Sequence, residues 1–173
     1  ADITADLIPE SKSAIAHTRW ATHGVVALRN AHPHTSQSGT FSIVHNGVIT
    51  NHASLRKALE ENGFVFSSET DTEVVANLFE FLGGPQRTPE EVVEDVRKRL
   101  EGEYALCVMS KWWGEIIVAT RQESPLIMAT KPDGIAIASD ESALQGFELC
   151  ASLEDEDILK VWSDDDGINY ELY

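Results

Sequence analysis

The sequence predicts an α+β domain built on antiparallel β-sheets. Three helical patterns lie together in the middle of the chain, and strand-like segments precede and follow them. Several of these segments are apolar at nearly every residue, which predicts that both faces of the sheets are covered. Short connections such as KWWG at 111–114 favour antiparallel pairing. A doubly wound nucleotide-binding fold is not expected, because the sequence has no suitable Gly-rich strand-to-helix turn.

Three helices are expected, at 51–62, 71–82 and 89–101. The first two carry an apolar stripe at helical spacing and stop at a glycine. Two capping boxes mark helix starts, Thr70 with Glu73 and Thr88 with Glu91, and Pro89 stands at the first position of the third helix.

The strand-like segments are rich in β-branched and aliphatic residues. They lie at 15–18, 41–45, 104–110, 115–120, 125–130, 134–139, 157–162 and 168–173. The last two are expected to form a hairpin, because the loop between them ends in Asp-Gly.

Length and composition predict one domain over 1–173. The net charge of −16, from 13 basic and 29 acidic residues, argues against nucleic acid or an anionic membrane as partner. The Gly/Pro-dense stretch 83–89 reads as a connection within this domain. Two cysteines are too few for a disulfide framework, and no apolar run reaches the length of a membrane span. A reducing, cytoplasmic location is therefore expected.

Four polar clusters stand between or at the ends of the apolar segments, at 17–24, 30–35, 44–47 and 67–73. In the third, the amide of Asn46 and the backbone N–H of Gly47 make a suitable pair of donors for an oxyanion. The alternative is a plain Asn-Gly turn.

Arg19 and Asp71 together suggest an amino-acid ligand. Arg19 can hold a carboxylate in a bidentate pair, and Asp71, at the start of a helix, can accept hydrogen bonds from an ammonium group. The alternatives are a structural ion pair for Arg19 and a favourable interaction with the helix dipole for Asp71.

Four histidines within 18 residues, His17, His23, His32 and His34, raise the question of a metal site. No cysteine or dense carboxylate group accompanies them, so no metal and no other cofactor is expected, and the histidines are interpreted as hydrogen-bonding residues that shape loops. Cys107 and Cys150 lack an adjacent base or cation, so neither is expected to be an activated nucleophile.

The motifs HTRWATHG, NAHPHT, VHNGVITNH and SETDTEV, in this order, resemble the glutaminase domains of the glutamine:fructose-6-phosphate aminotransferases, which are class II glutamine amidotransferases. The resemblance runs from about residue 14 to about residue 160. It implies the N-terminal nucleophile hydrolase fold, a four-layer αββα sandwich, and hydrolysis of glutamine to glutamate and ammonia for amino-sugar synthesis.

The resemblance also implies roles for individual residues. Arg19 would bind the α-carboxylate of glutamine and Asp71 its α-ammonium group, while Asn46 and Gly47 would form the oxyanion hole. The same pocket would be lined by Trp20, Thr22 and His23.

The resemblance further implies a cysteine nucleophile at the first residue, whereas this sequence begins with Ala1 and has 16 residues before HTRW. We expect the domain to be incomplete at its N-terminus and the chain alone to be inactive. A separate Cys-headed segment and an isomerase or synthase domain are the expected partners. The alternative is a catalytically inactive amino-acid-binding or regulatory module.

Overall fold

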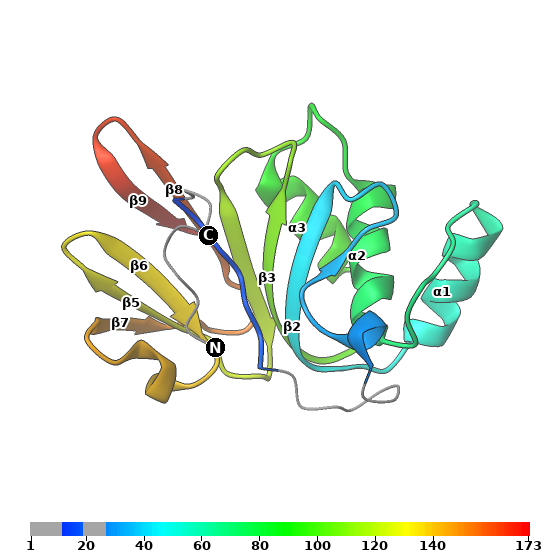
Figure 1. Ribbon diagram of the computed structural model, residues 1–173, viewed down its shortest axis with the longest axis horizontal. Coiled ribbons are helices and arrows are strands. Elements are labelled where there is room, and N and C mark those ends of the chain that lie inside the picture. Colours follow the sequence, from blue (N-terminus) through cyan, green and yellow to red (C-terminus); the bar gives the residue numbers. More distant parts are fainter. Residues whose placement is uncertain (1–11, 19–26) are drawn as a thin grey trace.

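The computed structural model describes residues 12–18 and 27–173 of the chain. Its main sheet has six strands in the order β1-β2-β3-β4-β8-β9, and every neighbouring pair is antiparallel. The strands are β1 (His34–Thr35), β2 (Phe41–Ile49), β3 (Gly102–Ser110), β4 (Ile117–Gln122), β8 (Ile158–Asp164) and β9 (Gly167–Leu172). Adjacent strands β2 and β3 are separated in sequence by the whole helical region (Figure 1).

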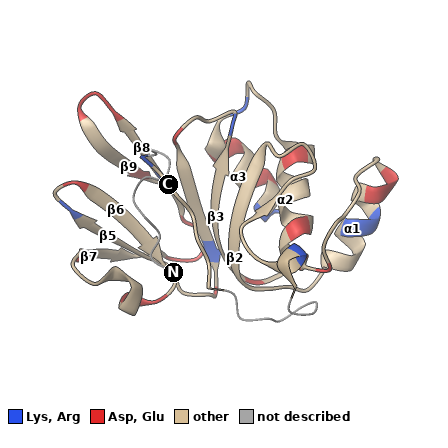
Figure 2. Cartoon of the chain, viewed as in Figure 1, with Lys and Arg blue, Asp and Glu red and all other residues tan. Residues whose placement is uncertain are grey.

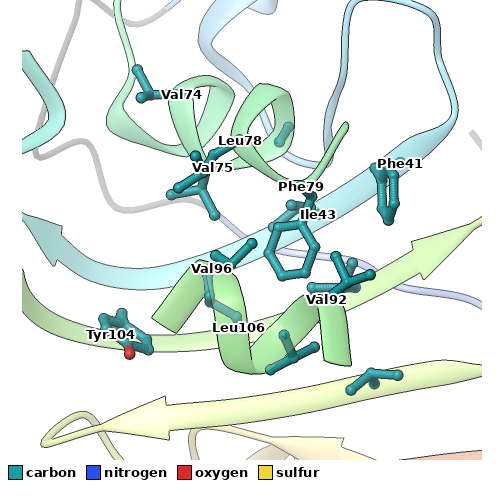
Figure 3. Close-up of a cluster of buried hydrophobic side chains, with 14 of the residues drawn as sticks. Phe41, Ile43, Val74, Val75, Leu78, Phe79, Val92, Val96, Tyr104 and Leu106 are labelled. Carbon is teal, nitrogen blue, oxygen red and sulfur yellow. The ribbon is translucent and has the colours of Figure 1, made fainter. Parts of the chain in front are cut away.

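A helical layer covers one face of this sheet (Figure 1). Helices α2 (Asp71–Leu82) and α3 (Pro89–Arg97) lie over the strands, and α1 (His52–Glu61) packs beside α2. Side chains at alternate positions of β2 and β3 point toward α2 and α3, among them Phe41, Ile43 and Leu106, which are fully buried (Figure 3). Phe79 of α2 packs on Phe41 with ring centroids 5.7 Å apart. This core fixes α2 against the strand that carries Asn46 and Gly47.

A smaller sheet lies on the other side, in the order β6-β5-β7. Its strands are β5 (Ile127–Lys131), β6 (Gly134–Ala138) and β7 (Glu148–Ser152). A second apolar cluster, which includes Ala105, Met128 and Leu159, joins it to the main sheet. A cavity of about 240 Å³ lies between the sheets, with Val44 and Ile137 in its lining. Two short 3₁₀ helices, η2 (Leu28–Asn30) and η3 (Glu141–Leu144), complete the described elements.

The three expected helices are confirmed, although the third ends at Arg97 rather than at 101. The hairpin of β8 and β9 is also confirmed. The strand expected at 15–18 is wrong, because this stretch has no strand assignment and instead lines the gap between the two sheets. The expected strand at 41–45 is too short, since β2 continues to Ile49. In the ranges 12–18 and 27–173, three of the four expected layers are seen.

The capping box at Thr88 and Glu91 is present in full, with Pro89 at the start of the helix. The box expected at Thr70 and Glu73 is half correct. Thr70 accepts a hydrogen bond from the N–H of Glu73, but the Glu73 carboxylate turns to Ser67 and Ser68 instead of the cap residue. Ser67 and Ser68 of the preceding loop thus donate to the Glu73 carboxylate in place of the N–H of Thr70.

Acidic residues are spread over the helices and over the ends of the hairpins (Figure 2). This distribution agrees with a solvated acidic surface rather than a single charged site. Among the helices of the described residues, none has the length and apolar character needed to cross a membrane.

Candidate functional site

Asn46 and Gly47 lie inside β2 and are paired with Ala105 and Tyr104 of β3, so the alternative of an Asn-Gly turn is wrong. Gly47 has a φ of +122°, and a Cβ at this position would stand 2.1 Å from the carbonyl oxygen of Glu103. The backbone conformation and the close approach of β3 therefore both require glycine.

Among residues 12–18 and 27–173, no strand pairs with the outer edge of β2 next to Asn46 and Gly47. β1 pairs with β2 only at Ser42 and Ile43. Beyond that point, the backbone N–H of His45 donates to Nδ1 of His32 (3.3 Å), and the N–H of Ile49 donates to Oδ2 of Asp71 (2.9 Å). Alternate N–H groups of a strand point to the same edge. The N–H of Gly47 therefore points to the same edge as the N–H groups of His45 and Ile49 and lies between them.

Asp71 is the first residue of α2, and it is buried. One carboxylate oxygen is bonded to Ile49, and the other lies 3.9 Å from Nδ1 of His45 and 3.5 Å from Oγ1 of Thr72. The carboxylate is thus held at the outer edge of β2 and does more than complement the helix dipole.

The loop before α2 is organised by Glu73. Its carboxylate accepts four hydrogen bonds, from the backbone N–H and the hydroxyl of both Ser67 and Ser68, over 2.6–2.8 Å. Burial alone would raise the pKa of Glu73, but these four hydrogen bonds outweigh it and hold the pKa below its ordinary value. The ionised carboxylate therefore fixes the turn that leads into Asp71.

Three histidines gather beside this edge. The rings of His17 and His32 are stacked with centroids 4.4 Å apart, and His34 meets His32 edge-on at 5.0 Å. Ring nitrogens of His32 and His34 lie 3.4 and 3.1 Å from the hydroxyls of Thr72 and Thr70. These contacts agree with the interpretation of His32 and His34 as residues that shape loops by hydrogen bonding.

Asn46 is exposed and faces the gap between the sheets, opposite to the buried His45. A small cavity of about 70 Å³ lies there, lined by Asn46 together with His17 and Cys107. Burial raises the pKa of the Cys107 thiol to about 12. Cys107 is therefore not poised as a nucleophile, although it lies near the oxyanion candidates.

The structure places Asp71, at the start of α2, beside the strand β2 that carries Asn46 and Gly47. Arg19, Trp20, Thr22 and His23 lie outside the described residues. Sequence reasoning did not single out Thr72, whose hydroxyl is 3.0 Å from Nδ1 of His45. It also assigned no role in the site to the carboxylate of Glu73. Both residues belong to the polar cluster SSETDTE, which was the available signal.

The fold and the arrangement around β2 define a glutamine amidotransferase domain. The family model described as "Glutamine amidotransferase domain" matches residues 17–146, and the chain belongs to this family.

Curated relatives are named glutamine–fructose-6-phosphate aminotransferase (isomerizing). The protein from Methanococcus maripaludis is 40% identical over 164 residues, which cover 91% of this chain and 27% of the relative. The protein from Caldanaerobacter subterraneus is 49% identical over 138 residues, which cover 78% of this chain and 22% of the relative. The chain thus spans about a quarter of the length of these relatives.

Two solved structures share the fold. One is a glutamine phosphoribosylpyrophosphate amidotransferase from B. subtilis, complexed with ADP and GMP. The match covers 90% of this chain and 33% of the amidotransferase chain, with a TM-score of 0.72 and 26% identity. A structure described as the allosteric regulatory enzyme of purine biosynthesis matches 90% and 34%, with a TM-score of 0.73 and 26% identity. The expected fold class, an α+β N-terminal nucleophile hydrolase-like domain with antiparallel sheets, is confirmed.

Proposed function

We propose that this chain binds L-glutamine at the outer edge of β2 and carries the oxyanion-stabilising part of a glutaminase site. The single observation that carries the proposal is the placement of a buried carboxylate, Asp71, on the same strand edge as the N–H of Gly47. A site for glutamine needs an anionic group for the α-ammonium end and donors for the amide end.

The remaining roles complete this proposal. Arg19 binds the α-carboxylate, and Trp20, Thr22 and His23 line the pocket, as the family resemblance implies. Asn46 and Gly47 stabilise the tetrahedral intermediate through the side-chain amide and the backbone N–H, respectively. Hydrolysis of the amide yields glutamate and ammonia. Family membership and the names of the curated relatives support this reaction.

The attacking thiol of this reaction is neither of the two cysteines in the sequence. Cys107 has a pKa of about 12 because of burial. Cys150 lies on β7, in the smaller sheet, whereas Asn46 and Gly47 lie on β2. We therefore expect this chain alone to bind glutamine without releasing ammonia at an enzymatic rate. The burial of Cys107 and the position of Cys150 on β7 also favour a second candidate function, a binding or regulatory module that recognises glutamine.

Two further elements belong to the proposal. The ammonia acceptor is a partner domain with bound sugar phosphate, in keeping with the names of the curated relatives.

The chain forms one domain over 1–173. It works in the cytoplasm, and the two free cysteines support this location.

Titration calorimetry of the 173-residue chain with L-glutamine tests the proposal. We expect saturable binding that Arg19→Ala weakens at least about tenfold, and that Arg19→Lys also weakens because an ammonium group cannot form the bidentate pair. Arg99→Ala is the matched control, since Arg99 is bonded to Asp95 near the end of α3. Absence of any binding to the wild-type chain would overturn the proposal.

A second ligand, 5-amino-5-oxopentanoate, tests whether Asp71 binds the α-ammonium group. This ligand is glutamine without that group. The wild-type chain should prefer glutamine to this ligand. Asp71→Asn should retain an acceptor for the Ile49 N–H but lose most of this preference, because the charge that faces the ammonium group is gone. An undiminished preference would exclude Asp71 as the ammonium-binding residue.

Release of ammonia distinguishes the two candidate functions. Native protein, isolated with whatever associates with it, is assayed for glutamate and ammonia. Turnover at enzymatic rates identifies a working glutaminase, whereas binding without turnover in the native assembly identifies the binding module.

A further inference from the structure

His32 lies where three parts of the proposed glutamine site meet. Its imidazole accepts a hydrogen bond from the N–H of His45 on β2, lies 3.4 Å from the hydroxyl of Thr72 on α2, and stacks on His17. His17 stands two residues before Arg19 in the chain. The ring of His32 thus contacts β2, which carries Asn46 and Gly47, and α2, which begins at Asp71. It also contacts His17, in the segment that precedes Arg19.

The contact with β2 replaces a missing strand. β1 pairs with β2 only as far as Ile43, so the N–H of His45 faces outward with no strand beside it among the described residues. Nδ1 of His32 accepts this N–H in place of a strand carbonyl. Two residues further along the same edge comes the N–H of Gly47, followed after two more by that of Ile49, which Asp71 accepts.

The hydrogen bond from the N–H of His45 to Nδ1 fixes the tautomer of His32. Because Nδ1 accepts a hydrogen bond from the backbone N–H of His45, a neutral ring carries its proton on Nε2, and this N–H donates a hydrogen bond to Oγ1 of Thr72. The same hydroxyl lies 3.0 Å from Nδ1 of His45 and 3.5 Å from Oδ1 of Asp71. His32 is therefore joined to Asp71 through a single hydroxyl as well as through β2.

We propose that His32 is a positioning residue of the glutamine site, which caps the N–H of His45 and thereby sets the edge of β2 from which the N–H of Gly47 reaches the amide oxygen of glutamine. This inference rests on the proposed function. His32 touches no reacting atom in it and acts through β2 and Thr72.

Two polar substitutions separate the roles of the two ring nitrogens. The amide oxygen of an asparagine reaches the position of Nδ1, so His32→Asn keeps an acceptor for the His45 N–H. The longer side chain of His32→Gln reaches the position of Nε2 and leaves that N–H without its acceptor. His34→Gln is the matched control, because it retains a group at the Nε2 position that faces Thr70 in the same loop.

Each variant of the 173-residue chain is titrated with L-glutamine and with L-norvaline, which is glutamine without the amide oxygen and nitrogen. We expect His32→Gln to raise the Kd of glutamine about tenfold, the equivalent of one hydrogen bond, with little change for norvaline. His32→Asn and His34→Gln should stay within about threefold of wild type for both ligands, as expected when that bond is kept. Backbone amide resonances of His45 and Gly47 should shift in His32→Gln more than in His32→Asn.

The proposal is overturned if His32→Gln leaves glutamine binding unchanged, if it weakens glutamine and norvaline equally, or if the asparagine and glutamine variants behave alike. Equal weakening of both ligands would indicate a general structural role. If the wild-type chain binds neither ligand, the proposed function itself fails, so the two failures are distinguishable.

Discussion

The backbone N–H of Ile49 donates to Oδ2 of Asp71 at 2.9 Å, which ties the first residue of α2 to the end of β2. Both groups are buried. The bond holds a carboxylate beside the strand edge on which Gly47 lies, so the two ends of the proposed glutamine site share one rigid frame.

Replacement of Asp71 tests this frame through stability. Asp71→Ala should lower the free energy of unfolding by about 1–3 kcal/mol, because it leaves the buried N–H of Ile49 without an acceptor. Asp71→Asn should cost about 1 kcal/mol or less, since the amide oxygen can take the same bond. Urea unfolding of the three proteins measures the difference. Equal losses in the two variants would show that the bond contributes little.

Gly47→Ala should destabilise the protein strongly. The new Cβ would meet the carbonyl oxygen of Glu103 at 2.1 Å, in addition to the strain of a φ of +122°. We expect a loss of about 3 kcal/mol or more, as for other strained or overpacked positions. Gly63→Ala is the control for strain alone, because its φ is +89° with no atom within 4 Å of the new Cβ. It should cost about 1–2 kcal/mol.

Glu73→Gln should make the free energy of unfolding less dependent on pH. The folded-state pKa of Glu73 is lowered, so its ionised form stabilises the fold above its unfolded pKa of about 4.5, and this contribution is lost as pH falls through the folded value. The variant should be less stable than wild type by about 1–3 kcal/mol at neutral pH, because it loses charged acceptors. Below pH 4.5 the difference should shrink. A constant difference from pH 7 to pH 3 would contradict the lowered pKa.

The two cysteines should differ in reactivity. Burial raises the pKa of Cys107 to about 12, while Cys150 is exposed on β7. Brief treatment of the folded protein with iodoacetamide, followed by peptide mass spectrometry, should find the label on Cys150 and almost none on Cys107. In denaturant both should react. Rapid labelling of Cys107 in the folded protein would reopen its candidacy as a nucleophile.

The local patterns predicted those elements whose signals lie within a few residues. Helix α3 has a complete capping box at Thr88 and Glu91, and the β8–β9 hairpin has a turn sequence between two alternating strands. Strand β7 was not predicted, because Glu148–Ser152 is largely exposed and has no strong apolar run, and it exists through pairing with the distant β5. The end of β2 was missed because Asn-Gly commonly forms turns, and only pairing with β3 keeps it extended.

The candidate site shows the same division. Asn46, Gly47 and Asp71 were named from motifs, because their side-chain types and order indicate a chemistry. His32 was expected to form hydrogen bonds in a loop, but its bond to the N–H of His45 and the contacts of Thr72 were not predicted. They depend on which backbone N–H groups remain outside the β1–β2 ladder. That information appears only when strands far apart in sequence are placed together.

The order of the sheet also governs how the site comes into being. Ile49 pairs with Gly102, and Phe41 with Ser110, so the pairing of β2 with β3 closes a loop that contains all three helices. Such distant pairings form slowly, because the chain entropy lost in bringing the partners together precedes the gain from contact. The edge geometry of the strand that carries Gly47 therefore depends on this long-range pairing. The proposed binding of glutamine would then require the completed domain, and a short peptide that contains the VHNG motif should not bind glutamine.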